Sequence, residues 1–202
     1  MLPNLNPTDL KNAVRDIVDR LQRDRDNLLP AWARGEPDAV LRSRRFIVCG
    51  STCMPEVRVL ARHAEVVGVV DDFLSRERTE IEGIPLLDAD GWIDRARGDP
   101  GIATVILAPS ARAFQYFSRL CMQWELDCLD PLQYLHLLKR RGADTRGETG
   151  RFFWYGHEFF EGTLRDADAL LDLAGQLDDG YSRISWLCVM LYRLTLNPLW
   201  LD

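Results

Sequence analysis

The chain has 202 residues, of which 47% are hydrophobic and 28% charged, and its formal net charge is -6. These values are typical of one globular domain with helical attachments, and they exclude a disordered chain, a collagen-like fibre and a disulfide-stapled miniprotein. An acidic chain has no overall attraction to nucleic acid, and no apolar run approaches the roughly 18 residues of a membrane span. Without a signal peptide or a C-x-x-C pair, its five cysteines predict reduced thiols in the cytoplasm.

The N-terminal region predicts an amphipathic helix over residues 8–27, with Thr8 as its N-cap. Its apolar residues recur at helical spacing: Leu10, Val14, Ile17, Val18 and Leu21. Prolines between residues 30 and 37 break the pattern, and a short helix through Val40 and Leu41 follows. We therefore expect residues 1–44 to form a helical extension.

Residues 45–141 alternate between short apolar runs and helical patterns. The runs predict strands at 46–49, 65–70, 104–108 and 127–129, and a turn with a short strand within 80–87. The helical patterns cover residues 55–63, 89–97, 111–125 and 132–140. Strands that alternate with helices imply βαβ units, so we expect an α/β, Rossmann-like, mostly parallel sheet of about five strands, with helices on both faces.

Residues 142–202 predict a linker, an aromatic segment and a helical pair. The basic stretch Lys139, Arg140, Arg141, Arg146 and Arg151 is interrupted by glycines, which favours a solvated linker over a phosphate-binding patch. Six aromatic residues crowd an irregular segment at 152–160, and helices are expected over 163–177 and 182–196.

A ligand site is predicted where the parallel strands end, because open α/β sheets bind ligands outside the carboxyl ends of their strands. The candidate ligand-binding residues at these ends are Gly50, Ser51, Thr52, Asp71, Asp72 and Ser110. Asp71 follows Gly50 by 21 residues, close to the roughly 20 that separate a phosphate loop from a ribose-binding carboxylate. Alternatively, the two aspartates only end a strand and cap the next turn.

The first of these loops differs from a dinucleotide-binding loop. Only Gly50 remains of a G-x-G-x-x-G pattern, and Pro55 has no amide hydrogen to offer a phosphate. The loop therefore favours either a smaller phosphorylated ligand or a lost site. Cys53 has no base nearby in the sequence, since His63 falls at the far end of the next helix, so no catalytic residue is predicted. His157 and Glu161 are too few to make a metal site.

Two segments resemble a known family. The run Val-Val-Gly-Val-Val-Asp-Asp at residues 66–72, followed by Ile-Glu-Gly-Ile-Pro-Leu-Leu at 81–87, resembles the Rossmann-like unit ahead of the catalytic domain in FkbM-type methyltransferases. A similar unit begins bacterial nucleotide-sugar O-acyltransferases. The segments at 177–183 and 191–195 are similar to the helical region that joins the FkbM unit to its methyltransferase domain.

The resemblance implies a role in cytoplasmic modification of bacterial polysaccharides or glycans. The family's S-adenosylmethionine domain would follow residue 202, so no catalytic residue carries over, and only Gly50 and Asp71 match ligand-loop positions. The family's first loop usually reads G-A-G-G-x-G, from which this chain departs at residues 51–54.

Three functions are compatible with these observations. The first is a non-catalytic recognition or docking module of an FkbM-type methyltransferase or relative, which binds a nucleotide or nucleotide-sugar beside a C-terminal catalytic domain or another protein. The second is a small nucleotide-dependent sugar-modifying enzyme that uses Asp71 and Ser110. The third is a pure interaction module with a lost ligand site, in which Trp154 and Phe159 contact a protein partner.

Overall fold

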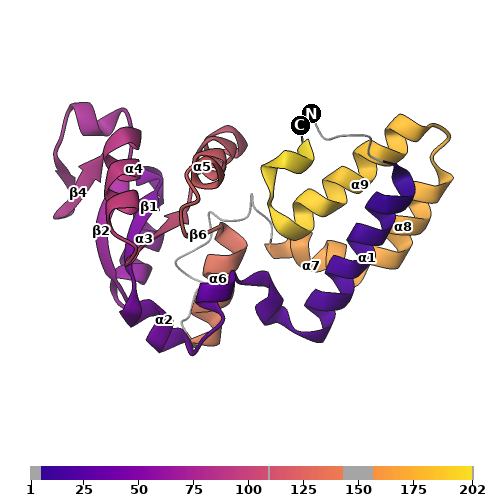
Figure 1. Ribbon diagram of the computed structural model, residues 1–202, viewed down its shortest axis with the longest axis horizontal. Helices are drawn as coiled ribbons and strands as arrows, with labels where there is room; N and C mark the ends of the chain where they lie inside the picture. The colour runs from indigo at the N-terminus through magenta and orange to yellow at the C-terminus, as the bar shows by residue number, and fades with distance from the viewer. Residues whose placement is uncertain (1–5, 109, 143–156, 202) are drawn as a thin grey trace. The chain divides into compact units, whose positions relative to one another are not determined.

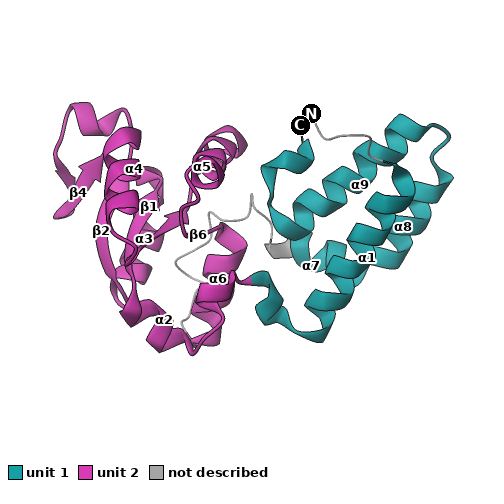
Figure 2. Ribbon diagram, in the orientation of Figure 1, with its two compact units in different colours: residues 1–28, 155–202 teal, residues 29–154 magenta. Residues whose placement is uncertain are grey.

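The protein folds into two compact units. The computed structural model describes residues 6–108, 110–142 and 157–201 (Figure 1). Residues 29–154 form one unit, called here the sheet unit, and residues 1–28 join residues 155–202 in the other, called the helical unit (Figure 2). The N-terminal helix therefore belongs to the same unit as the C-terminal helices, although more than a hundred residues separate them.

The sheet unit contains one six-stranded sheet, mostly parallel, in the order β3-β4-β2-β1-β5-β6. The strands are β1 (Arg45–Cys49), β2 (Glu65–Val70), β3 (Glu80–Ile81), β4 (Ile84–Leu87), β5 (Ile102–Ile106) and β6 (Cys128–Leu129). This arrangement confirms the predicted α/β, Rossmann-like fold with helices beside a parallel sheet. The apolar runs of β1 and β5 are buried almost completely, as strands covered on both faces require.

The segment at residues 80–87 contributes two strands rather than one. Glu82 and Gly83 both have positive φ angles, 51° and 78°, and form the tight turn of an antiparallel hairpin between β3 and β4. The extra strand β3 brings the sheet to six strands instead of about five.

One helix precedes β1, and the others alternate with the strands as expected. The helices are α2 (Pro37–Ser43), α3 (Met54–Ala61), α4 (Ala89–Gly98), α5 (Ala111–Gln123) and α6 (Pro131–Arg140). The chain moves outward from β1 to β2 through α3, and then crosses back to β5 through α4. Because parallel crossovers are right-handed, this reversal places α3 and α4 on opposite faces of the sheet.

Two buried aromatic side chains tie the helices together. On one face, the Trp92 indole of α4 donates a hydrogen bond of 3.0 Å to the Thr104 hydroxyl of β5 and packs edge-on against Phe117 of α5. The Tyr134 hydroxyl of α6 donates to the backbone carbonyl of Glu56 in α3 at 2.9 Å. Helices α4 and α5 therefore share one face of the sheet, while α3 and α6 contact each other.

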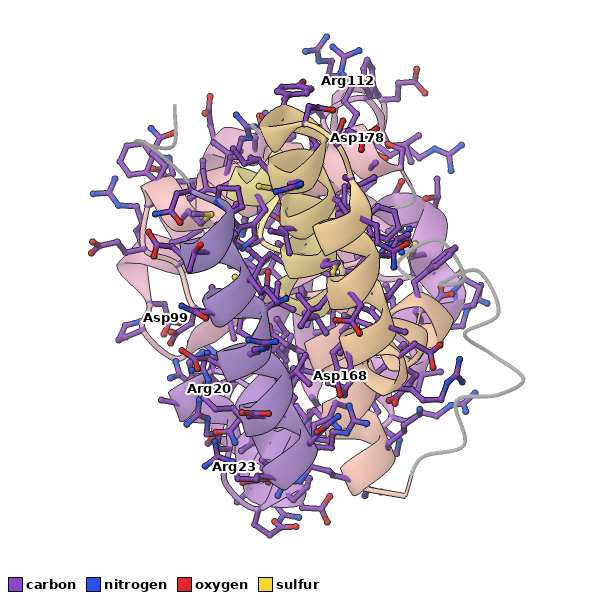
Figure 3. The ribbon with its side chains drawn as sticks, turned by 90° about the vertical axis from the view of Figure 1, so that its right-hand side faces the viewer. Arg20, Arg23, Asp99, Arg112, Asp168 and Asp178 are labelled. Carbon is purple, nitrogen blue, oxygen red and sulfur yellow. The ribbon has the colours of Figure 1, made fainter. Side chains whose placement is uncertain are left out.

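The helical unit consists of α1 (Pro7–Arg23), α7 (His157–Arg165), α8 (Ala167–Gln176) and α9 (Gly180–Thr195). Asn6, rather than Thr8, caps α1, and its side chain accepts a hydrogen bond from the Asp9 amide; Pro7 suits the first helical position. Figure 3 shows Arg20 and Arg23 projecting from the exposed side of α1.

The C-terminal helices begin earlier than the sequence pattern predicts. Helix α7 begins at His157, so the end of the aromatic segment is helical rather than irregular, and the helix expected over 163–177 is divided at Asp166 between α7 and α8. Residues 152–156 of that segment, Trp154 among them, lie outside the described residues. Among the helices that the structure describes, none is both long and apolar enough to cross a membrane.

Candidate functional site

The carboxyl ends of β1 and β5 lie side by side at the point where the strand order reverses. The Leu107 amide donates to the Cys49 carbonyl at 2.9 Å, which joins the two strand ends. Gly50 follows with a φ of 126°, and a side chain there would place its Cβ 3.0 Å from the Leu107 carbonyl oxygen. Only glycine therefore fits this position, because the two backbones approach closely and the φ angle is positive.

The loop after Gly50 is a short, tightly packed 3-10 turn. Ser51 and Cys53 are buried within it, and only Thr52 is exposed. The Cys53 thiol donates to the Leu107 carbonyl at 2.6 Å, which holds the loop against the end of β5. Cys53 thus has a structural hydrogen bond at this edge.

Ser51 and Asp71 meet between the ends of β1 and β2. The Ser51 hydroxyl donates to one carboxylate oxygen of Asp71. The other oxygen accepts the backbone amides of Phe73 and Leu74 at 2.9 and 2.8 Å. Asp71 therefore faces the loop after β1, as a ribose-binding carboxylate does, and at the same time caps the turn after β2.

Asp72 and Ser110 also cap local structure. One oxygen of Asp72 accepts the Ala89 amide at the start of α4, at 2.7 Å. The Ser110 hydroxyl is the N-cap of α5 and accepts the Ala113 amide at 3.1 Å. Ser110 is exposed, so it still faces solvent at the strand ends.

Three further residues near this edge were not predicted from the sequence. Phe73, immediately after Asp72, is 80% exposed. Tyr116 of α5 is 44% exposed, and burial, with Asp72 as the next cause, raises the pKa of its phenol. Glu56 is fully buried in the first turn of α3. The sequence signal that could have pointed to Phe73 is its position directly after Asp71 and Asp72 at a strand end, and no local signal marked Tyr116 or Glu56.

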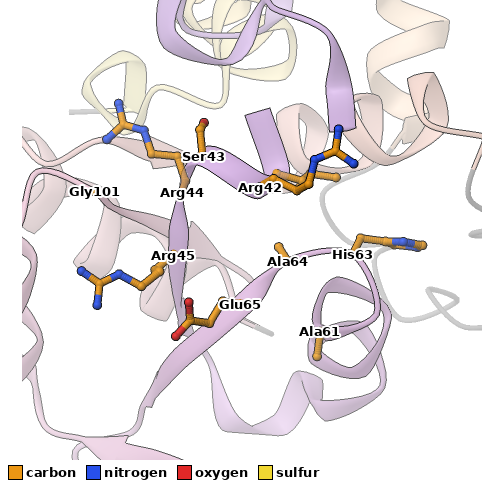
Figure 4. A pocket seen from close by; sticks show the side chains of 10 residues that line it. Arg42, Ser43, Arg44, Arg45, Ala61, His63, Ala64, Glu65 and Gly101 are labelled. Carbon is orange, nitrogen blue, oxygen red and sulfur yellow. The ribbon is translucent and has the colours of Figure 1, made fainter. Parts of the chain in front are cut away.

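A cavity of about 500 Å³ lies at the opposite edge of the sheet, where the strands begin (Figure 4). Arg42, Arg44 and Arg45 line it together with His63 and Glu65. Two of these arginines have acidic partners outside the lining: Arg44 pairs with Asp127 at 3.0 Å, and Arg45 pairs with Asp99. Most of the positive charge is therefore compensated, and the cavity lies away from the predicted strand-end residues.

Metal binding has no support among the described residues, where no group of three or more His, Cys, Asp or Glu side chains could hold an ion. The side chain of His157, and with it the pair of His157 and Glu161 named from the sequence, lies outside what the structure describes.

The basic stretch that begins at Lys139 is described only in part, because Arg146 and Arg151 lie outside the described residues. At its start, Arg141 pairs with Asp38 at 2.6 Å, and Arg140 donates to the Gly35 carbonyl at 3.1 Å.

The sheet order, the close β1–β5 approach and the strand-end acid define a Rossmann-like α/β protein. Neither a protein-family model nor a curated protein matches the chain. Among solved structures, it is similar to the methyltransferase FkbM from Methylobacillus flagellatus KT, with a TM-score of 0.64 and 21% sequence identity. The similarity covers 96% of this chain and 51% of that one, so the chain spans about half the length of the matched structure. The fold is thus FkbM-like over both units.

Proposed function

We propose that this chain is a non-catalytic recognition module of the FkbM type, which holds a nucleotide or nucleotide-sugar at the carboxyl ends of β1, β2 and β5. The observation that carries this proposal is the contact between Ser51 and Asp71. It aims a carboxylate from the end of β2 at the loop after β1, which is where Rossmann-like folds hold a ribose. The FkbM-like fold supports the same assignment.

The chemistry at this edge favours binding over catalysis. Nucleophilic catalysis needs a nucleophile within reach of a base, but the Cys53 thiol is buried and donates to a backbone carbonyl. His63, the nearest histidine in sequence, lines the cavity at the other edge of the sheet. In this proposal the group-transfer step belongs to a separate S-adenosylmethionine-dependent domain. The loop after β1 does not fit that cofactor, because Gly50 is its only glycine.

A docking module with a lost ligand site is the second candidate, and the same hydrogen bonds favour it. Both carboxylate oxygens of Asp71 already have partners within the chain, and Ser110 already caps α5. A ribose would have to displace the Ser51 hydroxyl from Asp71. If that exchange is unfavourable, the strand-end residues serve only the fold, and the module contacts a catalytic domain or another protein instead.

A ligand-binding screen separates the two candidates. The purified chain would be tested by thermal shift and calorimetry against UDP- and GDP-sugars, CMP-sugars, NAD, S-adenosylmethionine and inorganic phosphate. A ligand at 100 times its dissociation constant adds about 2.7 kcal/mol of stability. Binding of a nucleotide-sugar that is lost in Asp71→Asn but kept in Glu82→Gln, an exposed acid on the β3–β4 turn, would support recognition.

If the folded protein binds no ligand of the panel, nucleotide recognition is contradicted and the docking module remains. Product formation from a bound nucleotide-sugar would contradict both candidates and indicate a small sugar-modifying enzyme. The readout for turnover is conversion of the nucleotide-sugar to a product of different mass or retention time, which is measured separately from binding.

A further inference from the structure

Three of the five cysteines gather in one layer of the sheet unit. Cys49 ends β1 and Cys128 begins β6, while β5 lies between these two strands. The register pairs Cys49 with Ile106 and Cys128 with Thr104. Partners across a parallel ladder, and residues two apart on one strand, point to the same face of a sheet. Both thiols therefore point to the face that carries the Thr104 side chain.

Helix α5 covers that face and adds the third thiol. The Trp92 indole bonds to Thr104, and the Phe117 ring of α5 packs on Trp92 with centroids 5.7 Å apart. Cys121 follows Phe117 by four residues and so lies one helical turn further along the same buried stripe, with 2% of its surface exposed. The Leu126 amide then donates to the Cys121 carbonyl at 2.9 Å, which brings the chain back toward β6.

The buried stripe of α5 and the register of β6 thus bring the Cys121 and Cys128 side chains to the same face of the sheet, and neither is in a disulfide. A side-chain hydrogen bond to Cys128, with burial as the second cause, raises the pKa of the Cys121 thiol well above its ordinary value. The two cysteines differ in solvent exposure, because Cys121 is buried whereas Cys128 is half-buried. Cys49 is less well placed to form a disulfide with Cys121 or Cys128, since it is fully buried and pairs in the sheet with Ile106 rather than Thr104.

We propose that Cys121 and Cys128 form a thiol pair that hydroperoxides oxidise to an intramolecular disulfide. The Cys128 sulfur, which is the more accessible, attacks the peroxide oxygen; the O–O bond breaks, and a sulfenic acid and one water result. The Cys121 sulfur then attacks the Cys128 sulfur, the S–S bond forms, the S–O bond breaks, and the hydroxide leaves as water with the Cys121 proton. Two thiols and one hydrogen peroxide give one disulfide and two waters.

The disulfide would tie the last turn of α5 to the edge strand β6. The same helix begins at the Ser110 cap, beside the strand ends. Oxidation therefore acts on an element that borders the candidate site, although the proposal for the thiol pair does not depend on that site binding a ligand.

Mass spectrometry tests the proposal on the whole chain. The reduced protein would be exposed to equimolar hydrogen peroxide, unfolded and alkylated with N-ethylmaleimide. We expect three alkylated cysteines instead of the five in the untreated protein. Trypsin releases both residues in one peptide, 120–139, and cleavage after Glu125 separates them. The two fragments stay together only if the disulfide joins Cys121 to Cys128.

Matched variants locate the bond. Cys188→Ser, on α9 of the helical unit, is expected to lose two of its four thiols to oxidation as the wild type does. Cys128→Ser is expected to keep all four thiols, whereas Cys121→Ser is expected to lose only the Cys128 thiol, as a sulfenic acid, and to form no disulfide. The proposal is overturned if the wild-type protein keeps five alkylated cysteines, or if the peptide map joins Cys49 to either residue. The wild-type map decides the matter even where a variant does not fold.

Discussion

The Ser51 hydroxyl donates a hydrogen bond to the Asp71 carboxylate, and this contact joins the loop after β1 to the end of β2. The other Asp71 oxygen accepts the amides of Phe73 and Leu74, so one side chain organises two neighbouring loops. The stability of this edge and the binding of a ribose hydroxyl would therefore depend on the same carboxylate.

A double-mutant cycle measures this contact. Ser51→Ala removes one hydrogen bond to a charged group and is expected to cost about 1.5 kcal/mol of unfolding free energy. Asp71→Ala also removes the acceptor of two backbone amides and is expected to cost about 3 kcal/mol. The double variant should cost less than the sum, with a coupling of about 1 kcal/mol in urea denaturation. Additive losses would show that the two residues do not interact.

The close approach of β1 and β5 predicts a large effect of Gly50→Ala. The new Cβ would meet the Leu107 carbonyl oxygen at 3.0 Å, and the φ of 126° is strained for any L side chain. We expect a loss of about 3 kcal/mol or more. Gly83→Ala is the matched control, because its φ of 78° is also positive but no atom lies within 4 Å of the new Cβ. That control should cost about 1 kcal/mol, and equal losses would refute the steric argument.

The buried hydrogen bond between Trp92 and Thr104 predicts an asymmetric response to substitution. Thr104→Val keeps the shape of the side chain but leaves the indole N–H without an acceptor, at a cost of about 1–3 kcal/mol. In the Trp92→Phe background no donor remains, so Thr104→Val should then cost almost nothing. Chemical denaturation of the four proteins checks this, and an equal cost in both backgrounds would count against the hydrogen bond.

Burial of Asp130 predicts a pH dependence of stability. Asp130 caps α6 and is 9% exposed; burial raises its pKa from 3.8 to about 7, although the amides of Gln133 and Leu132 act in the opposite direction. The folded state thus holds this proton more tightly than the unfolded state. Its contribution to stability is complete below pH 3.8 and is lost as pH rises through about 7. The upper limit of that loss is about 4 kcal/mol, at 1.36 kcal/mol for each tenfold change in the ionisation constant.

Asp130→Asn tests this dependence, since an asparagine side chain still accepts the cap hydrogen bonds but does not ionise in this range. The unfolding free energy of the wild type should fall relative to the variant between pH 4 and pH 8. The measurement is urea denaturation of both proteins across that range. Parallel curves would mean that Asp130 is already ionised in the folded protein at low pH.

The sequence predicted the alternation of elements well, because that information is local. The apolar run at residues 65–70 coincides with β2, and the Asp-Pro pair before residue 132 marks the start of α6. Local signals were less reliable at helix ends. Thr8 and Asn6 are both good caps, and only the placement of Pro7 at the first helical position decides between them. The break between α7 and α8 at Asp166 is not marked by a glycine or proline at that position.

The location of the candidate residues at the strand ends could be predicted from the sequence, but their contacts could not. Strand ends follow from strand assignments, so Gly50, Ser51 and Asp71 could be named in advance. The sequence does not show which of their atoms have hydrogen-bond partners. The Ser51–Asp71 contact joins residues 20 apart, and their loops meet only when β1 and β2 pair. The hydrogen bond of Cys53 to Leu107 depends on the neighbouring strand in the same way.

The sequence by itself determined the fold class and the positions of the strand ends, because apolar periodicity, caps and turns act between residues a few positions apart. Only the tertiary structure decided the strand order, the pairing of the N-terminal helix with the C-terminal ones, and the meeting of Cys121 with Cys128. These depend on how helices and strands pack, and many packings satisfy the same local pattern. The free energy that selects one of them comes from buried contacts between residues distant in the chain.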